Sequence, residues 1–160
     1  MISDPARRGQ ALAELFQSLA PRLFEEIVET GVLPHLPGEA APDTARAEWD
    51  CFALYACVRG LVAAGGFNRE TAAAIDALHE RVLEAGDGAT RSLASERYAE
   101  YGAIGQEGGK AGAASVAQRL GEAAARHMVS GEPPAALIEL VGAMHESLAE
   151  GTTAAVRRAE

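Results

Sequence analysis

The stretch that decides the fold is Trp49-Asp50-Cys51-Phe52-Ala53-Leu54-Tyr55-Ala56-Cys57-Val58, in which apolar residues occupy nearly every position. Apolar side chains spread all round a helix are typical of a helix that other helices surround. The stretch lacks the alternation of apolar and polar residues that marks a half-buried strand. We therefore expect a central helix that begins at Asp43 or Thr44 and runs to about Ala64, before Gly65-Gly66.

The segment before this central helix also has helical spacing. Ser3-Asp4-Pro5 is typical of a helix start, with a capping residue followed by proline in the first turn. Apolar residues then recur every three or four positions over residues 12–28, and Gly31 is a typical stop. Pro21 lies inside this pattern and predicts a kink or a break. Residues 32–42, with three prolines, are expected to form a loop.

Four more helices are expected after the central one, from their caps and glycine breaks. They cover residues 68–86, a segment from near Thr90 whose end several glycines leave open, residues 110–129, and a segment from about Pro134 that fades after Gly151. Six helices with short connections predict an all-α fold, a single-domain antiparallel bundle over residues 1–160. Residues 1–4 and 152–160 are expected to fray.

The chain has an acidic excess, with 23 Asp and Glu against 14 Lys and Arg and a net charge of −9. Nucleic-acid binders need a basic surface that displaces counterions, so we expect no nucleic acid as partner. No uncharged apolar run approaches the roughly 20 residues of a membrane-spanning helix, so no membrane partner is expected either.

The two cysteines, Cys51 and Cys57, lie six positions apart. In one helix that spacing turns them about 240° apart, so they cannot pair with each other or hold one metal together. We interpret them as reduced thiols of the core, which fits a reducing compartment. Because the first residues also lack the apolar segment of a signal peptide, the sequence predicts a cytoplasmic protein.

Charged residues inside the apolar central helix suggest a ligand pocket between helices. Asp50 and Arg59 are costly to bury without partners, which we expect to be Arg46 or Arg97 for Asp50 and Glu96 or Glu100 for Arg59. If these charges have a structural role only, the helix is half-exposed and both ions are paired. If they have a functional role, they provide a polar anchor in an apolar ligand pocket. Its candidate residues are Trp49, Asp50, Tyr55, Arg59, Arg97, Tyr98 and Tyr101.

A ladder of small residues suggests a helix–helix interface. Its members are each four positions apart, which places them on one helix face: Gly105, Gly109, Ala113, Ala117, Gly121 and Ala125. A face without large side chains lets another helix approach closely. That helix belongs either to the same chain or to a second copy, which would make the protein a homodimer.

Other chemistry finds little support in the sequence. Asp76 and His79 are the nearest match to an acid-x-x-His metal motif, and the second motif that a di-metal bundle needs is missing. The glycine-rich residues 105–111 resemble a phosphate loop but lack its first glycine and its Ser or Thr. We therefore expect no cofactor, and Asp76 with His79 remain weak metal candidates.

Three functions remain open at this point. The first is a non-catalytic helical interaction protein that self-associates through a helix face. The second is a module that binds a small apolar or aromatic ligand between helices. The third is a helical metalloprotein. Since no catalytic constellation is visible, an enzyme is the less favoured reading.

Overall fold

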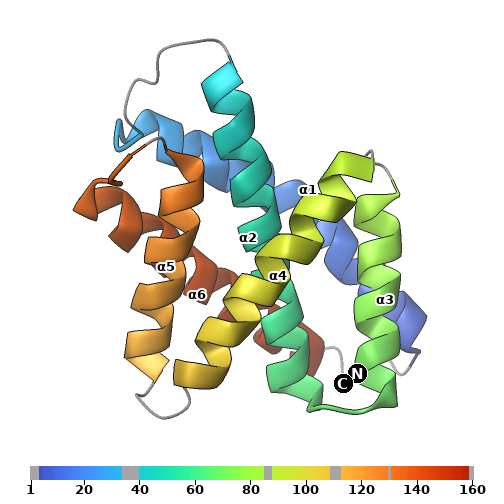
Figure 1. Ribbon diagram of the computed structural model, residues 1–160. Helices are drawn as coiled ribbons and strands as arrows, with labels where there is room; N and C mark the ends of the chain where they lie inside the picture. Colours follow the sequence, from blue (N-terminus) through green and yellow to red (C-terminus); the bar gives the residue numbers. More distant parts are fainter. Residues whose placement is uncertain (1–3, 34–39, 85–87, 109–112, 130, 159–160) are drawn as a thin grey trace.

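The computed structural model describes residues 4–33, 40–84, 88–108, 113–129 and 131–158. These residues form helices and no strand, which confirms the expected all-α fold (Figure 1). The helices are α1 (Pro5–Glu29), α2 (Ala40–Gly65), α3 (Arg69–Leu83), α4 (Gly88–Gly108), α5 (Ala113–Met128) and α6 (Ala135–Arg158).

The first helix begins where the sequence predicts it. The Asp4 carboxylate accepts a hydrogen bond from the backbone N–H of Ala6, and Pro5 occupies the first turn. The helix continues through Pro21 to Glu29, so the expected break at this proline is wrong. Gly31 follows with φ of +72°, a left-handed conformation that glycine adopts without strain.

The other helix ends differ from the predictions by a few residues. Both α2 and α4 begin earlier than expected, at Ala40 and Gly88. Residues 109–112, where the fifth helix was expected to begin, lie outside the described residues. The expected fading after Gly151 is wrong, because α6 continues to Arg158. Thr152 and Val156 are buried there, so packing holds the last turns in place.

Helix α2 has the central position that its apolar composition predicts. It contacts each of the other helices, α1, α3, α4, α5 and α6. The buried core also draws residues from every helix, including Phe16 of α1, Leu78 of α3, Tyr101 of α4 and Leu120 of α5. Among the described residues no helix has the length and apolarity that a bilayer-spanning segment requires.

The directions of neighbouring helices are mixed. In α1 and α2 the contacts run in opposite senses, since Trp49 bonds to Ala20 and Arg46 lies over Phe24. Between α2 and α6 the residue numbers of contacting pairs increase in both helices, from Phe52 with His145 to Ala63 with Arg157. The two helices therefore run in the same direction, and the predicted purely antiparallel bundle needs that correction. In Figure 1, α6 crosses behind α2 and α5.

Candidate functional site

Trp49 lies deep in the interior, at the contact between α2 and α1. The side chain is fully buried, and its indole N–H donates a hydrogen bond of 2.9 Å to the backbone carbonyl of Ala20. Its ring meets Phe52 edge to face, with centroids 6.4 Å apart. Since the polar atom of Trp49 is already bonded within the chain, this residue is part of the core.

An aromatic cluster fills the space between α2, α4 and α6. Phe52 stacks on the imidazole of His145, with ring centroids 4.0 Å apart, and lies 5.2 Å from Tyr101. Tyr55 lies 5.2 Å from Tyr98 and 5.6 Å from Tyr101. The candidate pocket residues Tyr55, Tyr98 and Tyr101 are thus brought together, but they pack on one another.

Two buried polar atoms in this cluster lack a partner among the described residues. They are Nε2 of His145 and the hydroxyl of Tyr101. His145 Nδ1 lies 3.0 Å from the backbone carbonyl of Phe52 and must carry the proton, because a carbonyl can only accept. Burial, helped by the nearby Arg59, lowers the pKa of His145 to about 3. The imidazole is therefore neutral, with Nε2 as an acceptor.

The sequence alone did not single out His145. It is flanked by the apolar residues Val141, Met144 and Leu148 at helical spacing, which is the pattern of a buried position. That spacing was the available signal, but it did not indicate which helix would cover the histidine.

Asp50 and Arg59 of the central helix are both paired, and Arg59 has a partner other than those first considered. Asp50 binds Arg46 at 3.1 Å, one of the two expected partners. Arg59 binds Glu146 of α6 at 2.6 Å, so the expectation of Glu96 or Glu100 is wrong. Arg59 projects toward α6, which runs alongside this part of α2, and so meets an acid of that helix.

Arg97 forms an ion pair with Glu48 that is the most buried one among the described residues. Two hydrogen bonds of 2.7 and 2.8 Å join its guanidinium to both carboxylate oxygens. Only 6% of the Glu48 side chain is exposed, against 16% for Arg97. The hydrogen bonds to Glu48 raise the pKa of Arg97 above its ordinary value. This pair joins α2 to α4, and Glu48 was missed because nothing in the sequence distinguishes it from a surface glutamate.

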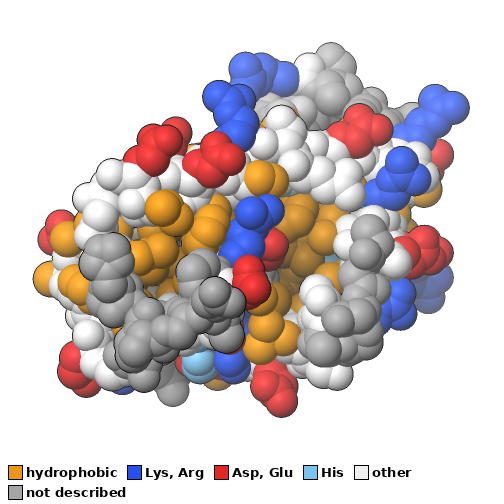
Figure 2. Space-filling view, turned by 90° about the horizontal axis from the view of Figure 1, so that it is seen from above, with side chains coloured by type: hydrophobic (Ala, Val, Ile, Leu, Met, Phe, Trp, Pro, Cys, Tyr) orange, Lys and Arg blue, Asp and Glu red, His pale blue; other side chains and the backbone are white. Residues whose placement is uncertain are grey.

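A small hollow lies next to Asp50, between α1, α2, α3 and α4. It has a volume of about 280 Å³ and is lined by Phe16, Gln17, Asp50, Cys51, Leu54, Val82, Leu83 and Thr90. Burial raises the pKa of Asp50 above its ordinary value, although the Arg46 charge opposes this shift. Seen from above in Figure 2, hydrophobic side chains gather on both sides of a basic and an acidic side chain. Of the candidate pocket residues, Asp50 is the one that lines this hollow.

The thiols are both buried and free. Burial raises the pKa of Cys51 to about 12, with further increases from the charges of Glu48 and Asp50. Burial likewise raises the pKa of Cys57 to about 11. At neutral pH both side chains are thiols, which are poor nucleophiles.

The weak metal candidates lie on α3. His79 is hydrogen-bonded through Nε2 to the hydroxyl of Tyr98 at 2.9 Å, and burial lowers its pKa against the raising effect of Asp76. Asp76 itself is exposed. Within the part of the chain that the structure describes, His, Cys, Asp and Glu nowhere form a group of three suited to a metal ion.

The ladder of small residues is divided between two helices. Gly105 belongs to α4 and is exposed, Gly109 lies outside the described residues, and Ala113 begins α5. The other three, Ala117, Gly121 and Ala125, lie within α5.

Part of this ladder packs against α6. A Cβ added to Gly121 would lie 2.8 Å from the carbonyl oxygen of Ile138 and 3.1 Å from Cα of Gly142. Ala125 is fully buried. At Gly121 and Ala125 the small residues therefore serve packing within the chain, and they are not accessible to a second copy.

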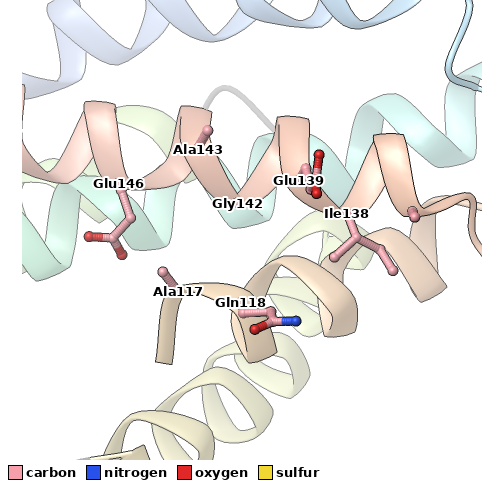
Figure 3. Close-up of a pocket in the computed structure, with 8 residues that line it drawn as sticks. Ala117, Gln118, Ile138, Glu139, Gly142, Ala143 and Glu146 are labelled. Carbon is pink, nitrogen blue, oxygen red and sulfur yellow. The ribbon is translucent and has the colours of Figure 1, made fainter. Parts of the chain in front are cut away.

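A shallow groove follows the same α5–α6 contact on its outer side. It has a volume of about 470 Å³ and is lined by Ala117, Gln118, Ala135, Ile138, Glu139, Gly142, Ala143 and Glu146. In Figure 3, Glu146 extends from α6 toward Ala117, and Gln118 lies on the opposite wall. Its lining combines the apolar side chains of Ala135, Ile138 and Ala143 with the carboxylates of Glu139 and Glu146.

We compared the chain with protein-family models, with curated proteins and with solved structures, and none of the three comparisons gives a match.

Proposed function

We propose that this chain is a non-catalytic helical interaction protein that binds a second copy of itself through one exposed helix face. We call this surface the outward face of α6. It consists of Glu139, Ala143, Ser147, Glu150, Gly151, Ala154, Arg157 and Arg158, which are exposed or, for Ala154, half-exposed.

The observation that carries this proposal is the combination of small and charged side chains on one side of α6. Ala143, Ser147 and Gly151 are four positions apart and exposed, so they share one stripe. A Cβ added to Gly151 would meet no atom within 4 Å. A helix of a second copy could approach this stripe closely, as α5 approaches Gly142 on the other side.

The interior supports a non-catalytic role. Of the candidate pocket residues, the tyrosines pack on one another, the charged residues are in ion pairs, and the indole of Trp49 bonds to a backbone carbonyl. Both thiols have raised pKa values. A nucleophile needs a lowered pKa or an adjacent base, and among the described residues neither thiol has either. We also propose the cytoplasm as the setting, because both thiols are free, and we expect no nucleic-acid partner because of the acidic excess.

Sedimentation velocity at 10 µM to 1 mM tests the proposal. We expect the mass to rise with concentration from that of one chain toward that of two. Ala143→Arg places a long charged side chain on the outward face of α6 and should abolish the rise. Ala72→Arg makes the same change at an exposed position of α3 and should leave the rise intact. Equal behaviour of the two variants would count against this face.

A second candidate function is binding of a small apolar ligand in the 280 Å³ hollow beside Asp50. The supporting observation is a half-buried carboxylate among the apolar side chains of Phe16, Leu54 and Val82. Ligand pockets have this composition, although this hollow is at the small end of their size range.

Fluorescence of Trp49, the chain's single tryptophan, is a probe of this hollow because its indole bonds to Ala20, one helical turn from Phe16 in the lining. We expect aromatic amines or amidines of about ten heavy atoms to change the emission and raise the melting temperature. Gln17→Phe would fill the exposed edge of the hollow without adding a second tryptophan, and Gln118→Phe, on the other groove, serves as control. A response that persists in Gln17→Phe would contradict binding at this place.

A further inference from the structure

The outward face of α6 has opposite charges at its two ends. Its first part carries the exposed Glu139, and its last turn carries the exposed Arg157 and Arg158. Arg158 bonds to the carbonyl of Ala154 in its own helix, and Arg157 to the carbonyl of Ala63, each at 3.4 Å. Between these ends lie four small residues, Ala143, Ser147, Gly151 and Ala154, and one further acid, the exposed Glu150. The face is therefore acidic over its first part and basic at its last turn.

Each end of this face also borders a surface hollow. The groove of about 470 Å³ between α5 and α6 has Glu139 and Glu146 among its lining residues. A second hollow, also of about 470 Å³, is lined by residues of the last turns of α6, including Thr153, Arg157 and Arg158. The acidic end therefore offers room for a long basic side chain.

We propose that two copies pair through α6 in an antiparallel, two-fold arrangement, with Glu139 of each copy facing Arg158 of the other. The inference rests on the self-association proposed above and adds its register. In an antiparallel pair the residue numbers at each contact have a constant sum, so Ala143 then faces Ala154 and Ser147 faces Glu150 of the second copy. The two ion pairs lie about 28 Å apart, at 1.5 Å per residue.

Charge complementarity selects a second copy in this orientation. A parallel pair would place Glu139 against Glu139 and Arg158 against Arg158, which is repulsive at both ends. The antiparallel pair makes both contacts attractive, and a two-fold axis makes them identical. The small residues Ala143, Ser147, Gly151 and Ala154 allow the two helices to approach each other. Glu150 of each copy lies about 4.5 Å along the helix from Glu150 of the other, and both side chains must extend toward solvent.

A contact of one helix with one helix buries less surface than a standard interface. We therefore expect a weak dimer, with a Kd in the range of tens to hundreds of micromolar. Because its ion pairs are at the surface, added salt should weaken it.

Charge reversal tests the register, with the dimer Kd measured by sedimentation equilibrium. E139R creates two Arg–Arg contacts in its homodimer, and R158E creates two Glu–Glu contacts. Each should raise the Kd at least tenfold. An equimolar mixture of the two variants forms a heterodimer in which both contacts are attractive, so its Kd should return to within about threefold of the wild-type value. E25R and R22E, exposed reversals on α1, are the matched controls and should leave the Kd unchanged.

The outcomes separate this inference from the function on which it rests. If the wild-type chain dimerises but either single reversal leaves the Kd unchanged, or the mixture binds no more tightly than the single variants, the register is wrong and self-association stands. If the wild-type chain remains monomeric up to 1 mM, both proposals fail.

Discussion

The interior between α2, α4 and α6 and the outward face of α6 both combine polar groups with small or aromatic side chains, but in opposite ways. In the interior, polar groups are bonded within the chain. Arg97 donates two hydrogen bonds to Glu48, and one ring nitrogen of the buried His145 bonds to the carbonyl of Phe52. On the outward face, Glu139 and Ser147 are exposed. The difference indicates which region supports the fold and which is open to a partner.

If this comparison is right, interior substitutions change the free energy of unfolding, and outward ones change association. The largest effect is expected for Arg97→Ala, which leaves the buried Glu48 without its cation. We expect a loss of about 3–4 kcal/mol, because an unpaired buried charge is costly. Urea denaturation measures it. The matched control is Arg126→Ala, which removes an exposed pair with Glu122 and should cost about 0.3 kcal/mol. Similar losses in both variants would show that burial of the Glu48 pair has no special role.

The next largest effect is a pH dependence of the free energy of unfolding, which arises from His145. Its pKa is about 3 in the folded chain and ordinarily near 6.5, so below pH 6.5 the unfolded chain binds a proton that the folded chain does not. Stability should therefore fall as pH decreases from about 6.5 toward 3, by about 1.4 kcal/mol per pH unit from this residue.

Urea denaturation between pH 7 and 4 measures this slope. His145→Phe removes the titrating group and keeps a ring that can stack on Phe52, so it should flatten the slope whatever its effect at pH 7. His127→Gln, at a half-exposed histidine bonded to Glu100, is the control and should keep the wild-type contribution of His145. If His145→Phe leaves the slope of the unfolding free energy against pH unchanged, the conclusion that His145 is buried as a neutral imidazole is wrong.

The same substitution at two glycines compares the two sides of α6. At Gly121 a methyl group would lie 2.8 Å from a backbone oxygen of α6, and backbone cannot move aside cheaply. We expect Gly121→Ala to cost about 1–2 kcal/mol, since overpacking exceeds the gain in helix propensity. Thermal melts give the direction. A stabilised Gly121→Ala would mean that α5 and α6 do not approach this closely.

The smallest effect is expected on the outward side. Gly151→Ala places its methyl group in open space within a helix, so it should stabilise the single chain by about 0.5–1 kcal/mol. The melt should be made at a concentration of a few micromolar, where association does not contribute. A destabilised Gly151→Ala would mean that this face is covered.

The sequence predicts the helices well, because helical spacing and caps are local properties. The central position of α2 follows from its apolar residues on all sides, and Asp4 caps α1 at the predicted helix start. The end of α6 was missed, because Gly151 is a local stop signal while the burial of Val156 is tertiary. Parallel contact of α2 with α6 also depends on the whole chain.

The candidate site was predictable only in part. Residues close in sequence gave correct pairs, such as Arg46 with Asp50 four positions on. Pairs that join distant helices, such as Arg59 with Glu146, could not be chosen from spacing. The ladder from Gly105 to Ala125 correctly predicted close helix packing. The sequence could not show that the helix packed against Gly121 is α6 of the same chain.

The central claim is that the chain pairs with a second copy of itself, and its mass as a function of concentration tests this most directly. Sedimentation equilibrium should give a mass that rises from 16.6 kDa at 10 µM toward twice that value at 1 mM. A mass of 16.6 kDa over the whole range would contradict the claim.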